Sequence, residues 1–149
     1  MANNLEASID IAASPEKVWS IIADLRRMSE FSPTTVKMAA IGGVREGALT
    51  INLNKDGWKI WPTTSRIVRF VPNTALAFRM NENHTVWSYE LAPSAAGTRV
   101  VERRTVDPKG LPAWMGPVIK ASGGEPKFEA DLVSGMHETL SKVKAAAER

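Results

Sequence analysis

The C-terminal segment constrains the fold most, because it predicts one long helix with a single apolar stripe. The run Gly123-Gly124-Glu125-Pro126 is typical of a helix start. Acidic residues then gather early in the segment and basic residues late, in the order that the helix dipole favours. A helix with one apolar stripe cannot bury that stripe alone, so the rest of the chain must cover it. The stripe recurs at three- and four-residue steps through Phe128, Leu132, Met136, Leu140 and Val143.

The part of the chain that could cover this helix reads as strands joined by short turns. Residues 5–11 alternate apolar and polar, the period of a half-buried strand. Pro62 lies inside a long strand pattern, which predicts an edge position or a bulge there. Short turns between successive strands indicate an antiparallel sheet, and hence the α+β class. The further strands are expected at residues 36–41, 48–54, 58–71, 75–80, 85–91 and 98–106.

Two short helices are expected between the first and second strands. Ser14 is a favoured N-cap, Pro15 suits the first helical position, and Glu16 suits the positive end of the helix dipole. A second short helix is expected near residues 25–31, and Pro33 ends it. The predicted order is therefore strand, helix pair, about six strands and one long helix.

Length and composition bound the class of protein. The chain has 149 residues, so we expect one domain over residues 1–149 with a core of its own. The absence of cysteine excludes disulfides, thiolate metal sites and cysteine nucleophiles. The net charge of +3 comes without a basic cluster, which argues against nucleic-acid binding. Because neither a signal peptide nor a membrane span is found, we expect a cytoplasmic protein. Its oligomeric state, monomer or dimer, stays open.

The opening motif resembles a known superfamily. Residues 8–19, Ser-Ile-Asp-Ile-Ala-Ala-Ser-Pro-Glu-Lys-Val-Trp, followed by Ile22-Ala-Asp24 and Phe31-Ser-Pro33, resemble the START-like (SRPBCC) superfamily. More narrowly, the chain looks like the polyketide cyclase/dehydrase and lipid transport family, related to the Bet v 1-like helix-grip proteins. The resemblance implies a curved seven-stranded antiparallel sheet around the long C-terminal helix. It also implies an apolar cavity between them that typically holds lipids, sterols or polyketides.

Candidate cavity walls follow from the aromatic and large apolar residues. The face that carries Trp87 and Tyr89 is richer in bulk, so we expect it to point inward. Gly135, beside Met136 in the helix, would let a ligand or a strand approach closely. The alternative is that these side chains simply fill the core. The candidate wall residues are Trp58, Trp61, Phe78, Trp87, Tyr89, Phe128, Leu132 and Met136.

Residues 107–124 form a long stretch rich in proline, glycine and apolar side chains. Such a stretch is often a lid, and here we expect Trp114 and Met115 to point into the cavity, with Leu111 beside them. The alternative is a short helix that closes the core and binds nothing.

Polar groups give fewer hypotheses. Tyr89, Arg104 and His137 are candidate anchors for the polar part of a ligand. Glu90 and Glu102 could be paired carboxylates on neighbouring strands with an acid–base role. More often such residues face solvent or pair with arginine, so that is what we expect of them here. The two histidines have no metal-ligand spacing, and no nucleophile or phosphate-loop motif is present, so no catalytic residue, metal or cofactor is assigned.

The function expected from these observations is binding or transport of a small hydrophobic molecule in an internal cavity, without catalysis. One alternative is a cyclase or dehydrase that folds a poly-keto substrate in the same cavity, with general acid–base help. A second alternative is a regulatory or toxin-like interaction protein, which would show an exposed apolar patch outside the cavity mouth.

Overall fold

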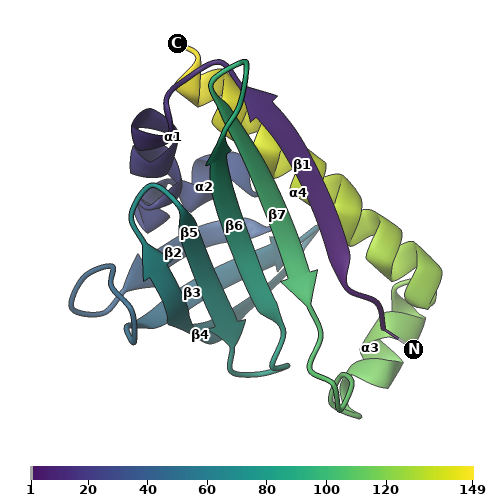
Figure 1. Cartoon of the computed structure of the whole chain (residues 1–149). Coiled ribbons are helices and arrows are strands. Elements are labelled where there is room, and N and C mark those ends of the chain that lie inside the picture. The colour runs from purple at the N-terminus through teal and green to yellow at the C-terminus, as the bar shows by residue number, and fades with distance from the viewer. Residues whose placement is uncertain (1) are drawn as a thin grey trace.

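A seven-stranded antiparallel sheet curves around the C-terminal helix (Figure 1). The computed structural model describes residues 2–149. The strand order is β1-β7-β6-β5-β4-β3-β2, and every neighbouring pair is antiparallel. The predicted α+β helix-grip architecture is thereby confirmed. The strands are β1 (Leu5–Ile11), β2 (Thr35–Ala40), β3 (Leu49–Asp56), β4 (Lys59–Val71), β5 (Ala75–Met80), β6 (Val86–Pro93) and β7 (Thr98–Thr105).

The helices start where the sequence signals them. The Ser14 hydroxyl accepts a hydrogen bond from the Lys17 backbone N–H at 3.3 Å, and Pro15 takes the first helical position. A 3₁₀ turn over Leu25–Arg27 leads into the second of the two predicted short helices. The helices are α1 (Pro15–Ile22), α2 (Met28–Phe31), α3 (Met115–Ala121) and α4 (Glu125–Ala147).

The core lies between the C-terminal half of α4, strand β1 and helix α1. Leu140 and Val143 of α4 are fully buried there, as are Ile11 and Val100 of the two paired strands β1 and β7. Trp19 packs edge-on against Phe70, with ring centroids 5.4 Å apart. The stripe predicted from the sequence is therefore buried by the sheet in this half of the helix.

Pro62 occupies a local edge of the sheet. Strand β5 pairs with β4 only from Ser65 onward, so residues 59–64 of β4 are paired with β3 alone. A proline there deprives no second neighbour of a hydrogen bond, and the predicted edge position is confirmed. The β3–β4 hairpin consequently projects beyond the rest of the sheet.

None of the helices within residues 2–149 has the length and apolar composition needed to cross a bilayer.

Candidate functional site

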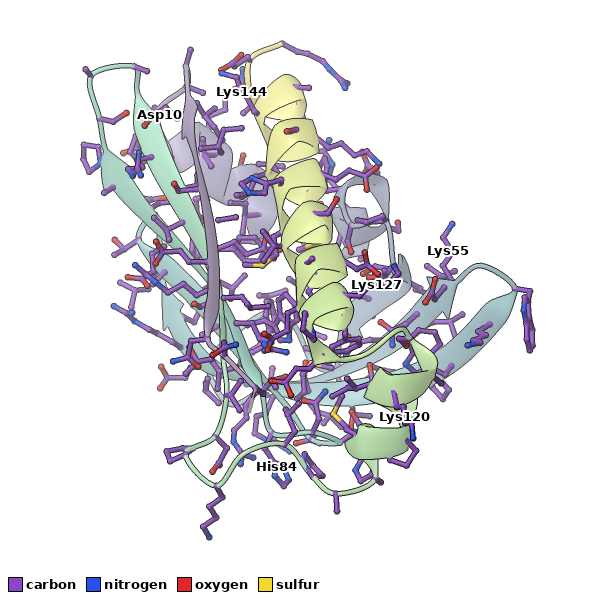
Figure 2. The ribbon with its side chains drawn as sticks, turned by 90° about the vertical axis from the view of Figure 1, so that its right-hand side faces the viewer. Asp10, Lys55, His84, Lys120, Lys127 and Lys144 are labelled. Atoms are coloured by element: carbon purple, nitrogen blue, oxygen red, sulfur yellow. The ribbon has the colours of Figure 1, made fainter. Side chains whose placement is uncertain are left out.

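A cavity of about 300 Å³ lies between the inner face of the sheet and the N-terminal half of α4. Figure 2 views the molecule with α4 in front of the sheet, where side chains of both elements occupy the space between them. The α2–β2 segment closes one side of the cavity, and strands β3 to β7 form the wall opposite α4. The fold thus leaves room under the half of α4 that the core does not fill.

Six of the predicted wall residues line this cavity. They come from four elements, because strands β4, β5 and β6 face helix α4 across the same space. The predicted inward face of β6 is correct, because Tyr89 is buried and Trp87 reaches the cavity. Contact of these side chains with a ligand stays a prediction. The six are Trp61, Phe78, Trp87, Tyr89, Leu132 and Met136.

Methionine is concentrated around the same space. Met28, Met38 and Met80 join Met136 in the lining, so four of the six methionines of the chain face the cavity. Methionine side chains are flexible and polarizable, and they adapt to ligands of irregular shape. The apolar wall is therefore deformable as well as aromatic.

A row of polar side chains runs along β3 and β4 on the cavity face. The Asn54 amide donates to the Thr63 hydroxyl at 2.8 Å, and the Asn52 amide donates to the same oxygen at 3.4 Å. The Thr50 hydroxyl donates to the side-chain Oδ1 atom of Asn52 at 3.0 Å and contacts the Ser65 hydroxyl. Asn52, Asn54 and Thr63 all line the cavity, so this end of it is polar.

Glu102 is the buried carboxyl group of the site. It lines the cavity with only 4% of its surface exposed, and it lies directly opposite Tyr89 in the β6–β7 register. Burial raises its pKa from 4.5 to about 8, although the Tyr89 hydroxyl offsets part of this rise. Glu102 therefore holds its proton at neutral pH. Its Oε1 atom is buried without a hydrogen-bond partner among the described residues.

Tyr89 stays a phenol beside this acid. Burial raises its pKa well above 10, and the nearby Glu102 carboxyl adds to the effect when it is ionised. The hydroxyl lies 3.9 Å from the Met28 sulfur, a weak acceptor. The Glu102–Tyr89 pair thus offers a ligand two protonated oxygens inside an otherwise aromatic and thioether-lined space.

The comparison with protein families decides the relationship of this chain. The model for "Polyketide cyclase / dehydrase and lipid transport" matches residues 3–148. The chain belongs to this family. No curated protein sequence matches it.

Solved structures of this fold resemble the chain along its whole length. The Zhui aromatase/cyclase from Streptomyces sp. R1128 is 19% identical, with a TM-score of 0.75 over 99% of this chain and 94% of that one. A Polyketide_cyc-like protein from Corynebacterium glutamicum is 26% identical, with a TM-score of 0.68 over 95% and 88%. The di-domain ARO/CYC StfQ from the steffimycin biosynthetic pathway is 13% identical with a TM-score of 0.78, and this chain spans half of its length. The match covers 97% of this chain.

Trp58 does not line the cavity of this family member. It sits at the tip of the β3–β4 hairpin with 88% of its surface exposed. The expected strand pattern began at Trp58, but Asp56 pairs with Lys59, so Gly57 and Trp58 form a two-residue loop. Gly57 takes the positive φ of +62° that the first position of such a loop requires.

The predicted residues on α4 divide according to helix geometry. His137 follows Met136 and points about 100° further around the helix, so it is exposed while Met136 faces the cavity. Phe128 lies one turn before Leu132, is half-buried and does not line the cavity. His137 as a polar anchor and Phe128 as a wall residue are therefore not supported by the geometry.

Residues 107–124 contain a short helix, α3, and contribute no side chain to the cavity lining. Met115 is buried, but Trp114 is 53% exposed and Leu111 is half-buried beside the loop. The expected lid with Trp114 and Met115 pointing inward is thus not seen. The alternative of a short helix is the one that forms, and α3 packs against the start of α4.

Arg104 is buried, and its side chain bonds to other parts of the fold instead of lining the cavity. Its Nη2 atom donates to Glu129 Oε2 at 2.9 Å and to the Asn3 carbonyl oxygen at 2.5 Å. Burial alone would raise the pKa of Glu129, but hydrogen bonds from Asn3 and Arg104 outweigh it and lower that pKa. Because Arg104 is engaged in this network and is absent from the cavity lining, the geometry does not support its expected role as a ligand anchor.

Glu102 is the residue whose orientation reasoning from the sequence predicted wrongly. Glu90 behaves as expected, since its carboxylate pairs with Arg103 on the outer face. Glu102 was expected to do the same, but the alternation of β7 turns it inward with Val100 and Arg104. The pairing of the strands could have predicted this orientation. Once the Tyr89 face of β6 is taken as the inner one, every second residue of the neighbouring strand must point to the same inner face. Nowhere in residues 2–149 do three histidine, aspartate or glutamate side chains gather as a metal site would require.

Proposed function

We propose that this chain binds one small, largely apolar molecule that carries a carbonyl or hydroxyl oxygen. The observation that carries the proposal is the cavity of about 300 Å³ with aromatic and methionine walls and, inside it, a protonated Glu102 whose Oε1 atom has no hydrogen-bond partner among the described residues. Ligand pockets for small molecules are mostly apolar with a few convergent polar groups, and their volumes begin at about 300 Å³. A compact ligand, such as one with a small ring system, suits this size.

The polar part of the ligand is inferred from the buried oxygen of the cavity wall that has no hydrogen-bond partner among the described residues. A buried oxygen without a hydrogen bond costs roughly 1–3 kcal/mol, so a ligand group that reaches Glu102 Oε1 gains affinity. The neutral carboxyl group both donates and accepts, and therefore matches a carbonyl or a hydroxyl better than a cation. The Asn52, Asn54 and Thr63 side chains offer a second polar contact on β3 and β4.

Catalysis is the second candidate function, and Glu102 favours it specifically. A carboxylic acid with a pKa near 8 beside a phenol is suited to give a proton to a ligand carbonyl and to take one back. The family description includes cyclases and dehydrases, and two of the similar structures carry aromatase/cyclase names. In this role Glu102 would be the general acid, and the walls would hold a poly-keto chain in a reactive conformation.

Native mass spectrometry of the purified protein tests the binding proposal. We expect a small organic mass that remains in gentle ionisation and is lost on denaturation. Returning the extracted compound to stripped protein should change tryptophan fluorescence through Trp61 and Trp87, the two tryptophans that line the cavity. The variant W58F, altered at the exposed hairpin tip, is the matched control and should respond like the wild type, while W61F and W87F should each lose part of the response.

The variant E102Q separates binding from catalysis. If the protein is a carrier, E102Q should weaken binding by about 2- to 10-fold, the worth of one hydrogen bond. If it is a cyclase, turnover of a poly-keto substrate should fall by about 100-fold or more with little change in binding. A stripped protein whose fluorescence responds to no apolar compound would contradict both functions.

A further inference from the structure

The β3–β4 hairpin carries an exposed apolar cluster, of which only one member, Trp61, also lines the cavity. Trp58 is 88% exposed at its tip and Ile60 is 64% exposed beside it, while Ile51 and Trp61 are exposed on its two faces. We call these four residues the hairpin patch. Large apolar side chains gathered on one projecting element are unusual for a surface that meets only water.

The backbone explains why none of residues 2–149 covers the tip of this patch. In the strand ladders, residues 55–60 pair across the hairpin alone, because β2 pairs with β3 up to Asn54 and β5 joins β4 only from Ser65. At the base of this segment, the Lys55 backbone N–H also donates to the Thr34 carbonyl oxygen at 2.8 Å. The tip is therefore a two-stranded finger that extends past the sheet. Figure 2 shows Lys55 on this hairpin, projecting from the right-hand side of the molecule.

Basic side chains flank the hairpin patch. Lys55 and Lys59 are exposed on either side of the Gly57-Trp58 loop, and neither forms an ion pair with another described residue. Between positions 49 and 66 the acidic residue is Asp56, against Lys55, Lys59 and Arg66. The finger thus combines an apolar tip with an excess of positive charge.

We propose that the hairpin patch docks on an anionic lipid bilayer. Tryptophan favours the membrane–water interface, where its ring is buried and its N–H stays hydrated, and Ile60 would enter the same layer. Lys55 and Lys59 would lie against negatively charged headgroups. A stable protein–protein interface instead buries about 800 Å² on each partner with some 20–30 residues, far more than this narrow finger presents.

Docking in this way brings the cavity to the bilayer. Trp61 belongs both to the hairpin patch and to the cavity lining, so the two sites share a side chain. A molecule that leaves the cavity past Trp61 would emerge beside the docked tip. The docking itself does not depend on what the cavity binds, because the patch and its charges lie on the outside.

Vesicle sedimentation of the full chain tests the docking. We expect binding to vesicles of phosphatidylcholine and phosphatidylglycerol at 7:3, and much weaker binding to pure phosphatidylcholine. W58A should lower the affinity by about 10-fold or more, and W58F should restore most of it. Each of K55A and K59A should lower it about fivefold, as expected for about 1 kcal/mol per lysine at an anionic surface, and added salt should weaken binding further.

Controls make the result specific to the finger. K142A removes an exposed lysine of α4 that pairs with Glu138, and it should leave vesicle binding unchanged. Brominated lipids should quench wild-type tryptophan fluorescence more than that of W58F. Equal binding of W58A and wild type would overturn the proposal, as would equal affinity for neutral and anionic vesicles. A concentration-dependent dimer that W58A abolishes, without vesicle binding, would instead assign the patch to self-association. None of these outcomes alters the cavity-ligand measurements, so the two proposals fail separately.

Discussion

At the scale of single residues, Glu102 decides what the cavity can do. Its carboxyl group is buried without a full set of hydrogen bonds, an arrangement that destabilises the charged form and raises the pKa to about 8. A ligand oxygen that pairs with Oε1 would satisfy the buried group. The same feature that suits a ligand therefore makes the protein sensitive to pH.

The free energy of unfolding should fall as the pH rises from about 4.5 to about 8. In this window the unfolded chain releases the Glu102 proton while the folded chain keeps it, so rising pH favours the unfolded state. The loss is at most about 5 kcal/mol over the window. E102Q removes the titrating group, so it should show a flatter profile and should be more stable than the wild type above pH 8.

Urea unfolding at several pH values checks this prediction. E90Q is the matched control, because Glu90 lies on the neighbouring strand but pairs with Arg103 on the outer face. The pH profile of E90Q should run parallel to that of the wild type. Parallel profiles for wild type and E102Q would show that Glu102 titrates normally and would remove the argument for a protonated acid in the cavity.

Reasoning from the sequence predicted the inward orientation of Tyr89 but expected Glu102 to face outward, and the reason is local. The bulk of Trp87 and Tyr89 identifies the inner face of β6. In β7 the alternation places Glu102 and Arg104 inward, and charged residues are rarely buried without a specific role. Composition rules therefore point such residues outward, and only strand pairing reveals which of them face the cavity.

At the scale of elements, the Arg104–Glu129 ion pair joins β7 to α4. Both side chains are buried, and Asn3 adds two further hydrogen bonds to the carboxylate. This network holds the N-terminal half of α4 against the sheet, at the end of the helix that covers the cavity. Helix α4 is thus held against the sheet at its N-terminal end by this network and at its C-terminal half by the core, with the cavity between these two contacts.

E129Q should destabilise the protein by about 3–5 kcal/mol, because it leaves the buried Arg104 charge without its counter-ion. For a chain of this size the melting temperature should fall by roughly 6–20 °C in thermal unfolding followed by circular dichroism. The double variant R104M/E129M, which removes both charges, should recover much of the loss. If the double variant instead lost as much unfolding free energy as R104M and E129M lose together, the two residues would act independently.

The elements themselves were largely predictable. Periodicity and turn residues place all seven strands and both short helices after β1, because those signals act over neighbouring residues. Residues 107–124 were harder, since a short helix among prolines and glycines has little periodicity to detect. Trp58 was misplaced by one residue, and at a hairpin tip one residue separates a strand from the loop.

At the scale of the whole molecule, the two halves of α4 have different roles. The C-terminal half packs on β1 and α1 and supplies core, while the N-terminal half arches over the cavity. No rule based on sequence could give the cavity volume, because it depends on how far the sheet curves away from the helix. The resemblance to the family predicted such a space, and the match over residues 3–148 confirms the family.

Substitutions at Gly135 can change the volume of the cavity directly. It lines the cavity on α4, and a Cβ atom at this position would lie 3.8 Å from Pro33 Cγ, an ordinary contact. G135A should therefore fold normally and gain up to about 1 kcal/mol from its better helix propensity. G135L should also retain the fold, but its longer side chain would extend into the cavity and compete with a ligand.

The most direct test of the ligand cavity is a methyl NMR titration of the methionines with small aromatic ketones and phenols. We predict shifts for the four lining methionines, Met28, Met38, Met80 and Met136, and none for Met115, which is buried elsewhere. The shifts should persist in G135A. In G135L, the ligand concentration needed to produce the same shifts should be at least 10-fold higher. Unchanged methionine spectra with every compound, or equal shifts in G135L, would contradict the claim that this protein holds a ligand between its sheet and α4.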